Sequence, residues 1–157
     1  MAENIKAKPT EYSGVIFRSK LEAKWAMYFD LLGIEWIYEP DSFILESGDV
    51  YCPDFYLEGL EVFCEVKPYQ QEDDRWYEFV KLENLPNEPE YRMILLFGEN
   101  IHCYPSFIIY NGGCNLVTIA HSDSKFAPLY YAADNLDSTI VKENQQFCDD
   151  VNNFKFD

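Results

Sequence analysis

Three ionisable residues stand in or beside two short apolar segments, in the stretch YCPDFYLEGLEVFCEVK at residues 51–67. Asp54 follows a proline, and Glu65 and Lys67 end the second segment two positions apart. Side chains alternate between the two faces of a strand, so Glu65 and Lys67 are expected on one face. Because a charged side chain is costly to bury without partners, we expect these three residues to interact with one another or with a ligand.

Two carboxylates on neighbouring strands would form an oxygen-rich site. We expect Asp54 to pair across the sheet with Glu65. Hard cations such as Mg²⁺ bind through one or two carboxylates and complete their shell with water. Lys67 beside them can hold a water or a phosphate oxygen, which completes the parts needed for metal-assisted attack of water on a phosphodiester. The alternative is an ordinary ion pair on a solvated face, because Glu-x-Lys is a common tripeptide.

The elements that would position these residues follow from the spacing of apolar and turn residues. A helix is predicted over 17–32, with Gly33 as its C′ residue and a core-facing stripe of Leu21, Trp25, Phe29 and Leu32. Short strands are predicted within the segments EWIYEP, FILES, YCPDFYL and LEVFCEVK, with turns at 47–49 and 58–59.

The second half of the chain continues the alternation of helices and strands. A helix is predicted over 72–85 and a strand buried on both faces over 91–97. A hairpin is predicted around the turn NGG at 111–113, and a polar helix over 136–153. This order predicts an α/β or α+β fold with a central mixed sheet flanked by helices.

One domain is expected from the length of 157 residues. Residues 1–12 are assigned to an N-terminal arm and 13–157 to the domain, with its C-terminal hairpin and helix over 105–157. The start of the chain carries no apolar run of the kind found in secretory signals, and no aliphatic run is long enough to span a bilayer. We therefore expect a cytoplasmic protein without a membrane partner.

The net charge of −16 comes from 12 Lys and Arg residues against 28 Asp and Glu residues. Between Lys24 and Lys67 the sequence has ten acidic residues and no Lys or Arg. Proteins that bind phosphate backbones usually carry the opposite balance, since neutralising phosphates drives their binding. A basic face would have to come mainly from the N-terminal segment, from Lys6, Lys8, Arg18, Lys20 and Lys24.

Glu22 has two interpretations that depend on where the first helix begins. Ser19 and Glu22 match the S-x-x-E capping box, in which Glu22 reaches back to the Ser19 amide and the helix starts at Ser19. If the helix instead begins near Phe17 or earlier, Glu22 lies inside it and can face the pocket of Asp54 and Glu65. The sequence leaves both interpretations open.

Three separate segments, FRSKLEAKWA, CPDF and CEVK, are followed by an apolar strand that ends in Phe97-Gly98. Taken together, they resemble the PD-(D/E)XK nuclease superfamily, in the small form common in phages and bacteria. The resemblance covers about residues 12 to 98, with the motif core over 17–98. It implies a restriction-endonuclease-like core, in which a mixed sheet is flanked by helices. The combination of spaced motifs is more specific than any one of them.

The resemblance also implies roles for individual residues. Asp54 and Glu65 would be the principal and second metal ligands, and Glu22 the helix-borne acid that touches a metal or its water. Lys67 would orient or activate the attacking water. The substrate phosphates would be contacted by basic residues of the first helix region, namely Arg18, Lys20 and Lys24.

The expected function is hydrolysis of DNA phosphodiester bonds by an endonuclease that requires Mg²⁺, for which Mn²⁺ can substitute. Such an enzyme could be structure-specific, could act as a homodimer as junction-cutting relatives do, and would act in the host cytoplasm if a phage encodes it. The alternative is an acidic, non-enzymatic protein on the same fold. It would mimic DNA and inhibit a basic partner, such as a nucleic-acid-binding defence protein.

Overall fold

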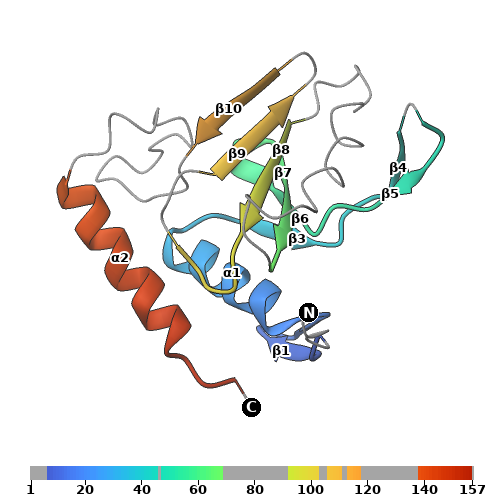
Figure 1. Cartoon of the computed structure of the whole chain (residues 1–157). Helices are drawn as coiled ribbons and strands as arrows, with labels where there is room; N and C mark the ends of the chain where they lie inside the picture. Colours follow the sequence, from blue (N-terminus) through green and yellow to red (C-terminus); the bar gives the residue numbers. More distant parts are fainter. Residues whose placement is uncertain are drawn as a thin grey trace, which may run out of the picture.

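The computed structural model describes residues 7–45, 47–68, 92–102, 106–110, 113–117 and 138–156. These residues form two α-helices, ten strands and one 3₁₀ turn (Figure 1). The helix predicted over 72–85 lies outside the described residues. No helix in the described part of the chain is long and apolar enough to cross a membrane.

A six-stranded sheet forms the centre of the fold, in the order β10-β9-β8-β7-β6-β3. Strands β7 and β8 run parallel, and every other neighbouring pair is antiparallel, so the sheet is mixed. The predicted coarse class of an α/β fold is confirmed. The strands are β3 (Trp36–Tyr38), β6 (Phe55–Leu57), β7 (Val62–Lys67), β8 (Arg92–Phe97), β9 (Ser106–Tyr110) and β10 (Gly113–Val117).

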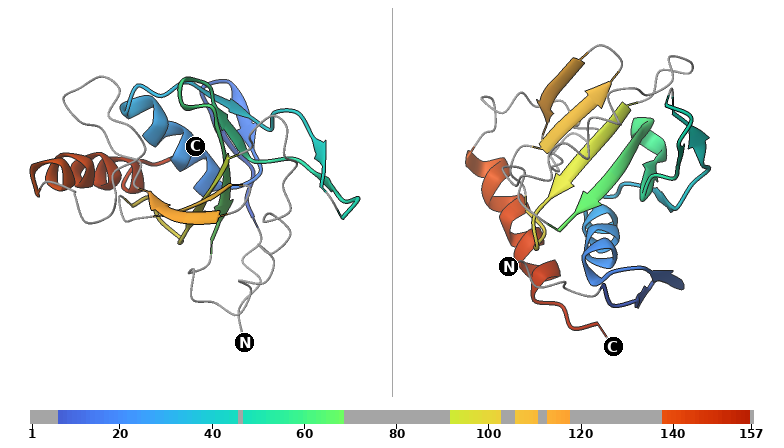
Figure 2. Two further views of the ribbon diagram at one scale, coloured as in Figure 1. Left: turned by 90° about the horizontal axis from the view of Figure 1, so that it is seen from above. Right: turned by 45° about the vertical axis from the view of Figure 1, so that its right-hand side comes forward.

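Helices α1 (Lys20–Leu31) and α2 (Ser138–Asn152) lie on the same face of this sheet (Figures 1 and 2). Their buried side chains share one core cluster with alternate residues of β7 and β8, including Val62, Cys64, Val66, Ile94 and Leu96. Helix α2 is also fixed at its end, because the Asn152 side chain exchanges hydrogen bonds of 2.9 and 3.0 Å with the Ile101 backbone. The predicted C-terminal helix is confirmed.

Helix α1 starts three residues later than the predicted range of 17–32. Ser19 is the N-cap: its backbone is extended and its hydroxyl accepts a hydrogen bond of 3.1 Å from the Glu22 amide. Phe17 instead ends strand β2. At the other end Gly33 has a φ of +72°, a left-handed conformation that suits glycine and ends the helix as predicted. The predicted stripe is largely confirmed, because Trp25, Phe29 and Leu32 are buried.

The predicted N-terminal arm contains a strand. β1 (Thr10–Tyr12) pairs antiparallel with β2 (Val15–Phe17), so the last residues assigned to the arm belong to a hairpin. Ser13 and Gly14, both with positive φ, form its turn. The Tyr12 hydroxyl donates a hydrogen bond of 2.6 Å to Asp30 of α1, which attaches the hairpin to the helix.

A second hairpin agrees with the strand predicted in FILES and the turn predicted at 47–49, whereas the strand predicted over 51–57 is divided between β5 (Val50–Tyr51) and β6 (Phe55–Leu57). β4 (Phe43–Ile44) pairs with β5, and this hairpin projects from the main sheet (Figures 1 and 2). Residues 52–54 separate β5 from β6, since Pro53 has no backbone N–H to give to a strand ladder. The predicted turn at 58–59 is the 3₁₀ turn η1 (Glu58–Leu60).

The predictions for β8, β9 and β10 agree with the structure. The side chains of β8 are buried on both faces: Ile94 and Leu96 face the helices, and Met93 and Leu95 are fully buried on the opposite face. β9 and β10 pair antiparallel on either side of 111–112, as the NGG signal predicts.

Phe55 is the aromatic centre of the core. Its ring lies 5.4 to 6.1 Å from those of Phe17, Phe29, Trp36 and Tyr38, centroid to centroid. Because this buried ring packs against residues of β2, α1 and β3 at once, we expect Phe55→Ala to lower the free energy of unfolding by about 3–5 kcal/mol in urea titrations. The control Ile37→Ala, on exposed β3 surface, should cost less than about 1 kcal/mol. A smaller loss for Phe55→Ala than for Ile37→Ala would contradict this assignment.

Candidate active site

The candidate site lies at one end of the sheet, where β6 begins and the parallel strands β7 and β8 end. Phe55 pairs with Cys64 in the antiparallel β6–β7 register, which sets Asp54, one position earlier, opposite Glu65. The Asp54 carboxylate accepts a hydrogen bond of 2.8 Å from the Val66 amide. The expected pairing of Asp54 with Glu65 across the sheet is therefore present.

Glu65 and Lys67 share one face of β7, as the alternation predicts. The Lys67 ammonium lies 3.3 Å from a Glu65 carboxylate oxygen, and their side chains are 27% and 11% exposed. A solvated surface ion pair would leave both side chains in water. Glu65 is buried and stands opposite a second carboxylate, so that simpler interpretation does not describe the site.

The two acids are held in an environment that disfavours their charged forms. Burial, followed by the nearby Glu65 charge, raises the pKa of Asp54 to about 8. Burial also raises the pKa of Glu65, although Lys67 and a hydrogen bond from Tyr51 work in the opposite direction. The mutual repulsion of the two carboxylates favours a proton on Asp54, and a cation bound between them would instead favour the charged form of both acids.

Tyr51 is a site residue that the sequence did not reveal. It lies on β5, and its hydroxyl donates a hydrogen bond to the second oxygen of Glu65 and contacts the Met93 sulfur at 3.9 Å. Burial and the Glu65 charge raise the pKa of Tyr51 strongly, so this hydroxyl stays a donor. No local pattern marks Tyr51, because it meets Glu65 only through the fold.

Glu22 combines parts of both interpretations, because the helix starts at Ser19 as the capping box predicts and the Glu22 side chain lies near Asp54. The helix begins at the Ser19 cap, yet the Glu22 carboxylate accepts a hydrogen bond from the Tyr38 hydroxyl on β3. The same hydroxyl accepts a hydrogen bond of 3.1 Å from the Arg18 amide. Glu22 lies near enough to Asp54 for its charge to contribute to the raised pKa of Asp54.

The predicted basic residues differ in how far they face solvent. The Arg18 side chain is 72% exposed and forms an ion pair of 2.5 Å with Glu39, whose charge raises the pKa of Arg18. Lys20 is exposed on the first turn of α1. Lys24 is only 7% exposed and donates a hydrogen bond of 3.3 Å to Asn100. Arg18 and Lys20 can therefore meet a substrate directly, whereas Lys24 is turned into the fold.

The donor set fits a hard divalent cation held by two carboxylates. Asp54 and Glu65 supply oxygen ligands from opposite positions of adjacent strands, and Mg²⁺ takes one or two carboxylates and keeps several waters. Within the described residues, no group of three or more His, Cys, Asp or Glu side chains is arranged to hold a metal. The role of Glu22 as a further metal-contacting acid stays a prediction.

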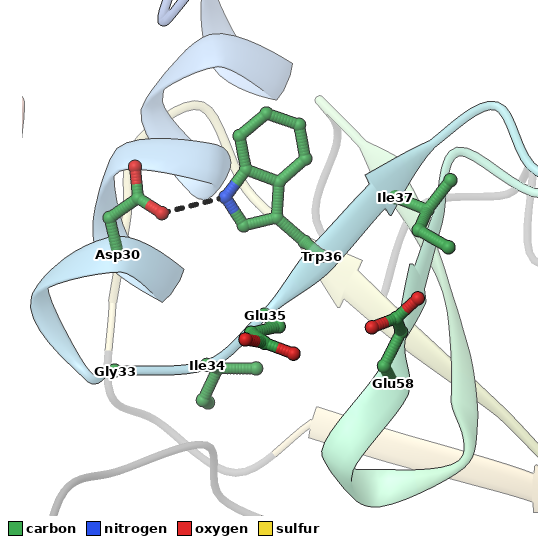
Figure 3. Close-up of a pocket in the computed structure, with 7 residues that line it drawn as sticks. All are labelled: Asp30, Gly33, Ile34, Glu35, Trp36, Ile37 and Glu58. Atoms are coloured by element: carbon green, nitrogen blue, oxygen red, sulfur yellow. Dashed lines mark hydrogen bonds between the residues drawn. The ribbon is translucent and has the colours of Figure 1, made fainter.

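A separate hollow of about 570 Å³ lies at the opposite ends of α1 and β6 (Figure 3). Its polar lining is acidic, from Asp30, Glu35 and Glu58, and Trp36 donates a hydrogen bond of 2.9 Å to Asp30. It contains no residue of the predicted site. The candidate site and the hollow are thus separate places in the fold.

No family model, curated protein or solved structure significantly matches this chain. The resemblance to PD-(D/E)XK nucleases therefore stays a prediction from sequence motifs, to be weighed with the geometry of the site.

The raised pKa of Asp54 predicts how stability changes with pH. An unfolded aspartate has lost its proton above about pH 4, while Asp54 in the folded chain keeps it to about pH 8. The folded state binds the extra proton, so its stability falls as pH rises across that window. Asp54→Asn keeps an acceptor for Val66 and removes the charge.

In EDTA, we therefore expect Asp54→Asn to melt above wild type at pH 9, with a gap that narrows towards pH 5. The rise of the Asp54 pKa from its ordinary value near 4 to about 8 is worth roughly 5–6 kcal/mol, so at about 2–4 °C per kcal/mol the gap at pH 9 should exceed about 10 °C. Glu58→Gln, which removes an exposed acid elsewhere, should follow the wild-type profile. Identical profiles for all three proteins would refute the buried pair.

Proposed function

We propose that this chain is a metal-dependent nuclease that hydrolyses phosphodiester bonds of DNA, with Mg²⁺ as cofactor and Mn²⁺ as a substitute. One observation carries the proposal: Asp54 and Glu65 stand opposite each other, both largely buried, with the Lys67 ammonium 3.3 Å from Glu65. An ordinary structural ion pair would not need the second carboxylate. A site that binds a cation in order to cut a polyanion would need two carboxylates as ligands.

We also propose that the core is restriction-endonuclease-like. The proposal is supported by the order of α1, the β6–β7 hairpin and the parallel β8, and by the match of these elements to the motif segments FRSKLEAKWA, CPDF and CEVK. In this arrangement the chain brings an acid before β6 and the Glu-x-Lys of β7 to one end of the sheet.

Each residue of the site would have a separate role in hydrolysis. A cation bound by Asp54 and Glu65 would lower the pKa of a bound water and offset charge at phosphorus. Lys67 places a positive charge where negative charge develops on the phosphate oxygens, a form of preorganised electrostatics. Tyr51 orients Glu65 by donating to the oxygen that Lys67 does not contact.

The wild-type chain should cleave DNA in Mg²⁺. The Asp54→Asn variant should cleave it at least about 100-fold more slowly, because stabilisation of the transition state by the metal is worth several kcal/mol. Lys67→Ala should lose a similar factor. Gel assays of duplex, branched and single-stranded DNA measure the rates. Matched controls are Glu58→Gln and Lys142→Ala, which change an exposed acid and an exposed lysine away from the site.

Calorimetric titration with Mn²⁺ gives a second readout, since wild type should bind the ion and Asp54→Asn should not. Cleavage by Asp54→Asn at the wild-type rate would overturn the proposed function, because the principal ligand would then be dispensable.

Arg18 and Lys20 would supply the contacts to phosphate. We expect Lys20→Ala and Arg18→Ala each to weaken DNA binding and to reduce the slope of log K against log salt by about 1, as one phosphate contact is lost. Lys24→Ala should leave this slope unchanged, because the Lys24 ammonium is buried against Asn100. Fluorescence anisotropy over a salt series tests all three, and an effect of Lys24 equal to that of Lys20 would contradict the assignment.

A second candidate function is an acidic binding protein with a basic partner. It is favoured by the hollow lined by Asp30, Glu35 and Glu58, and by the net charge of −16. The assays above also separate this function from the first. A DNA mimic would bind no DNA at any salt concentration, and its Asp54→Asn variant would retain all of its activity against the basic partner.

A further inference from the structure

The two oxygens of the Glu65 carboxylate have different partners. The Tyr51 hydroxyl donates a hydrogen bond to Oε2, and the Lys67 ammonium lies 3.3 Å from Oε1. Tyr51 belongs to the β4–β5 hairpin, whereas Lys67 is the last residue of β7, the strand that carries Glu65 itself. One oxygen of this carboxylate is therefore held by a neutral donor and the other by a cation.

Tyr51 is fixed in a way that keeps Oε2 engaged. Its strand pairs with β4, and the neighbouring Cys52 thiol donates a hydrogen bond of 3.3 Å to the Pro40 carbonyl. Burial and the Glu65 charge raise the pKa of Tyr51 strongly, so its hydroxyl keeps the proton that it donates. A cation such as Mg²⁺, which needs few protein ligands because it retains several waters, would consequently meet Glu65 at Oε1.

The Lys67 ammonium stands where such a cation would be attracted. Its charge acts on both acids, since it opposes the burial that raises the pKa of Asp54 and of Glu65. Two unit charges about 4 Å apart near a protein surface interact by about 4 kcal/mol, and a divalent ion doubles this repulsion. The ammonium and a divalent cation therefore compete for Oε1.

Lys67 can leave Oε1 by a movement of its side chain alone. The side chain is 27% exposed, and its ammonium is carried on a flexible stem. The backbone is fixed, because Lys67 pairs with Phe97 of β8 and its carbonyl accepts a hydrogen bond of 3.0 Å from the Gly98 amide. Glu65 and the sheet can keep their positions while the ammonium turns away.

We propose that the Lys67 ammonium occupies the cation site at Glu65 Oε1 when no divalent cation is bound, and that cation binding moves it from this oxygen to the attacking water or the phosphate. Tyr51 is a positioning residue in this exchange, because it directs the cation to the oxygen that Lys67 holds. The lysine then becomes available to the substrate once the metal is in place. This inference rests on the proposed nuclease function and concerns the order in which its site assembles.

The test is a calorimetric titration with Mn²⁺ at a fixed pH and without DNA. Lys67→Met removes the charge and keeps most of the side-chain length. We expect it to bind Mn²⁺ about tenfold more tightly than wild type, because no ammonium has to be displaced. Protons would also bind the two acids more tightly in this variant. A divalent cation is repelled about twice as strongly as a proton, however, so a net gain in affinity for Mn²⁺ remains.

Two control variants show whether the gain comes from the charge at this position. Lys67→Arg keeps the charge and should bind Mn²⁺ no more tightly than wild type. Lys142→Met removes an exposed lysine of α2 and should match wild type. Cooperative urea unfolding of each variant establishes that folded proteins are being compared.

A second pair of backgrounds tests the role of Tyr51. Tyr51→Phe frees Oε2 for the cation, so the gain caused by Lys67→Met should fall to about threefold or less in this background. Tyr12→Phe is the matched control, because it removes a hydroxyl that donates to a different carboxylate, that of Asp30. In the Tyr12→Phe background the gain should stay at about tenfold.

The outcomes distinguish this inference from the proposed function. Mn²⁺ affinity of Lys67→Met equal to or below that of wild type would overturn the exchange, as would equal gains in the Tyr51→Phe and Tyr12→Phe backgrounds. Cleavage of DNA by wild type would in either case leave the nuclease assignment standing. The expected pattern of Mn²⁺ affinities without any DNA cleavage would support the exchange and overturn the nuclease assignment, and no Mn²⁺ binding by wild type or any variant would overturn both.

Discussion

The burial of two opposed carboxylates at one end of the central sheet is the constraint on which the candidate site depends. The β6–β7 register sets Asp54 opposite Glu65, and each acid keeps its place through a specific donor, the Val66 amide for Asp54 and the Tyr51 hydroxyl for Glu65. Burial raises the pKa of both acids. Their repulsion is offset in this chain by Lys67 and would be offset further by a bound cation.

Two tyrosines donate hydrogen bonds to acids at or near this pair. Tyr51 joins the projecting hairpin to Glu65, and Tyr38 joins β3 to Glu22 of the first helix. Burial raises the pKa of both hydroxyls, so they remain hydrogen-bond donors to the carboxylates. Tyr51 thereby holds Glu65 from β5, and Tyr38 holds the nearby Glu22 from β3.

The strong negative charge fits a nuclease only if duplex backbone contacts are few. Arg18 and Lys20 remain exposed beside the site, while Lys24 is buried and the hairpin region carries only acids. Electrostatic attraction along a long duplex track is therefore weak.

Features that depend on local backbone repeats could be predicted from the sequence. Alternation put Glu65 and Lys67 on one face, helical spacing marked Trp25 and Phe29 as core, and the doubly buried β8 followed from its apolar run. Three contacts could be seen only in the folded chain: Tyr51 bonds to Glu65, Glu22 bonds to Tyr38 from the first turn of α1, and Lys24 is buried. Local patterns follow from periods of 2 and 3.6 residues, whereas contacts between distant segments depend on strand register and packing, which those periods do not encode.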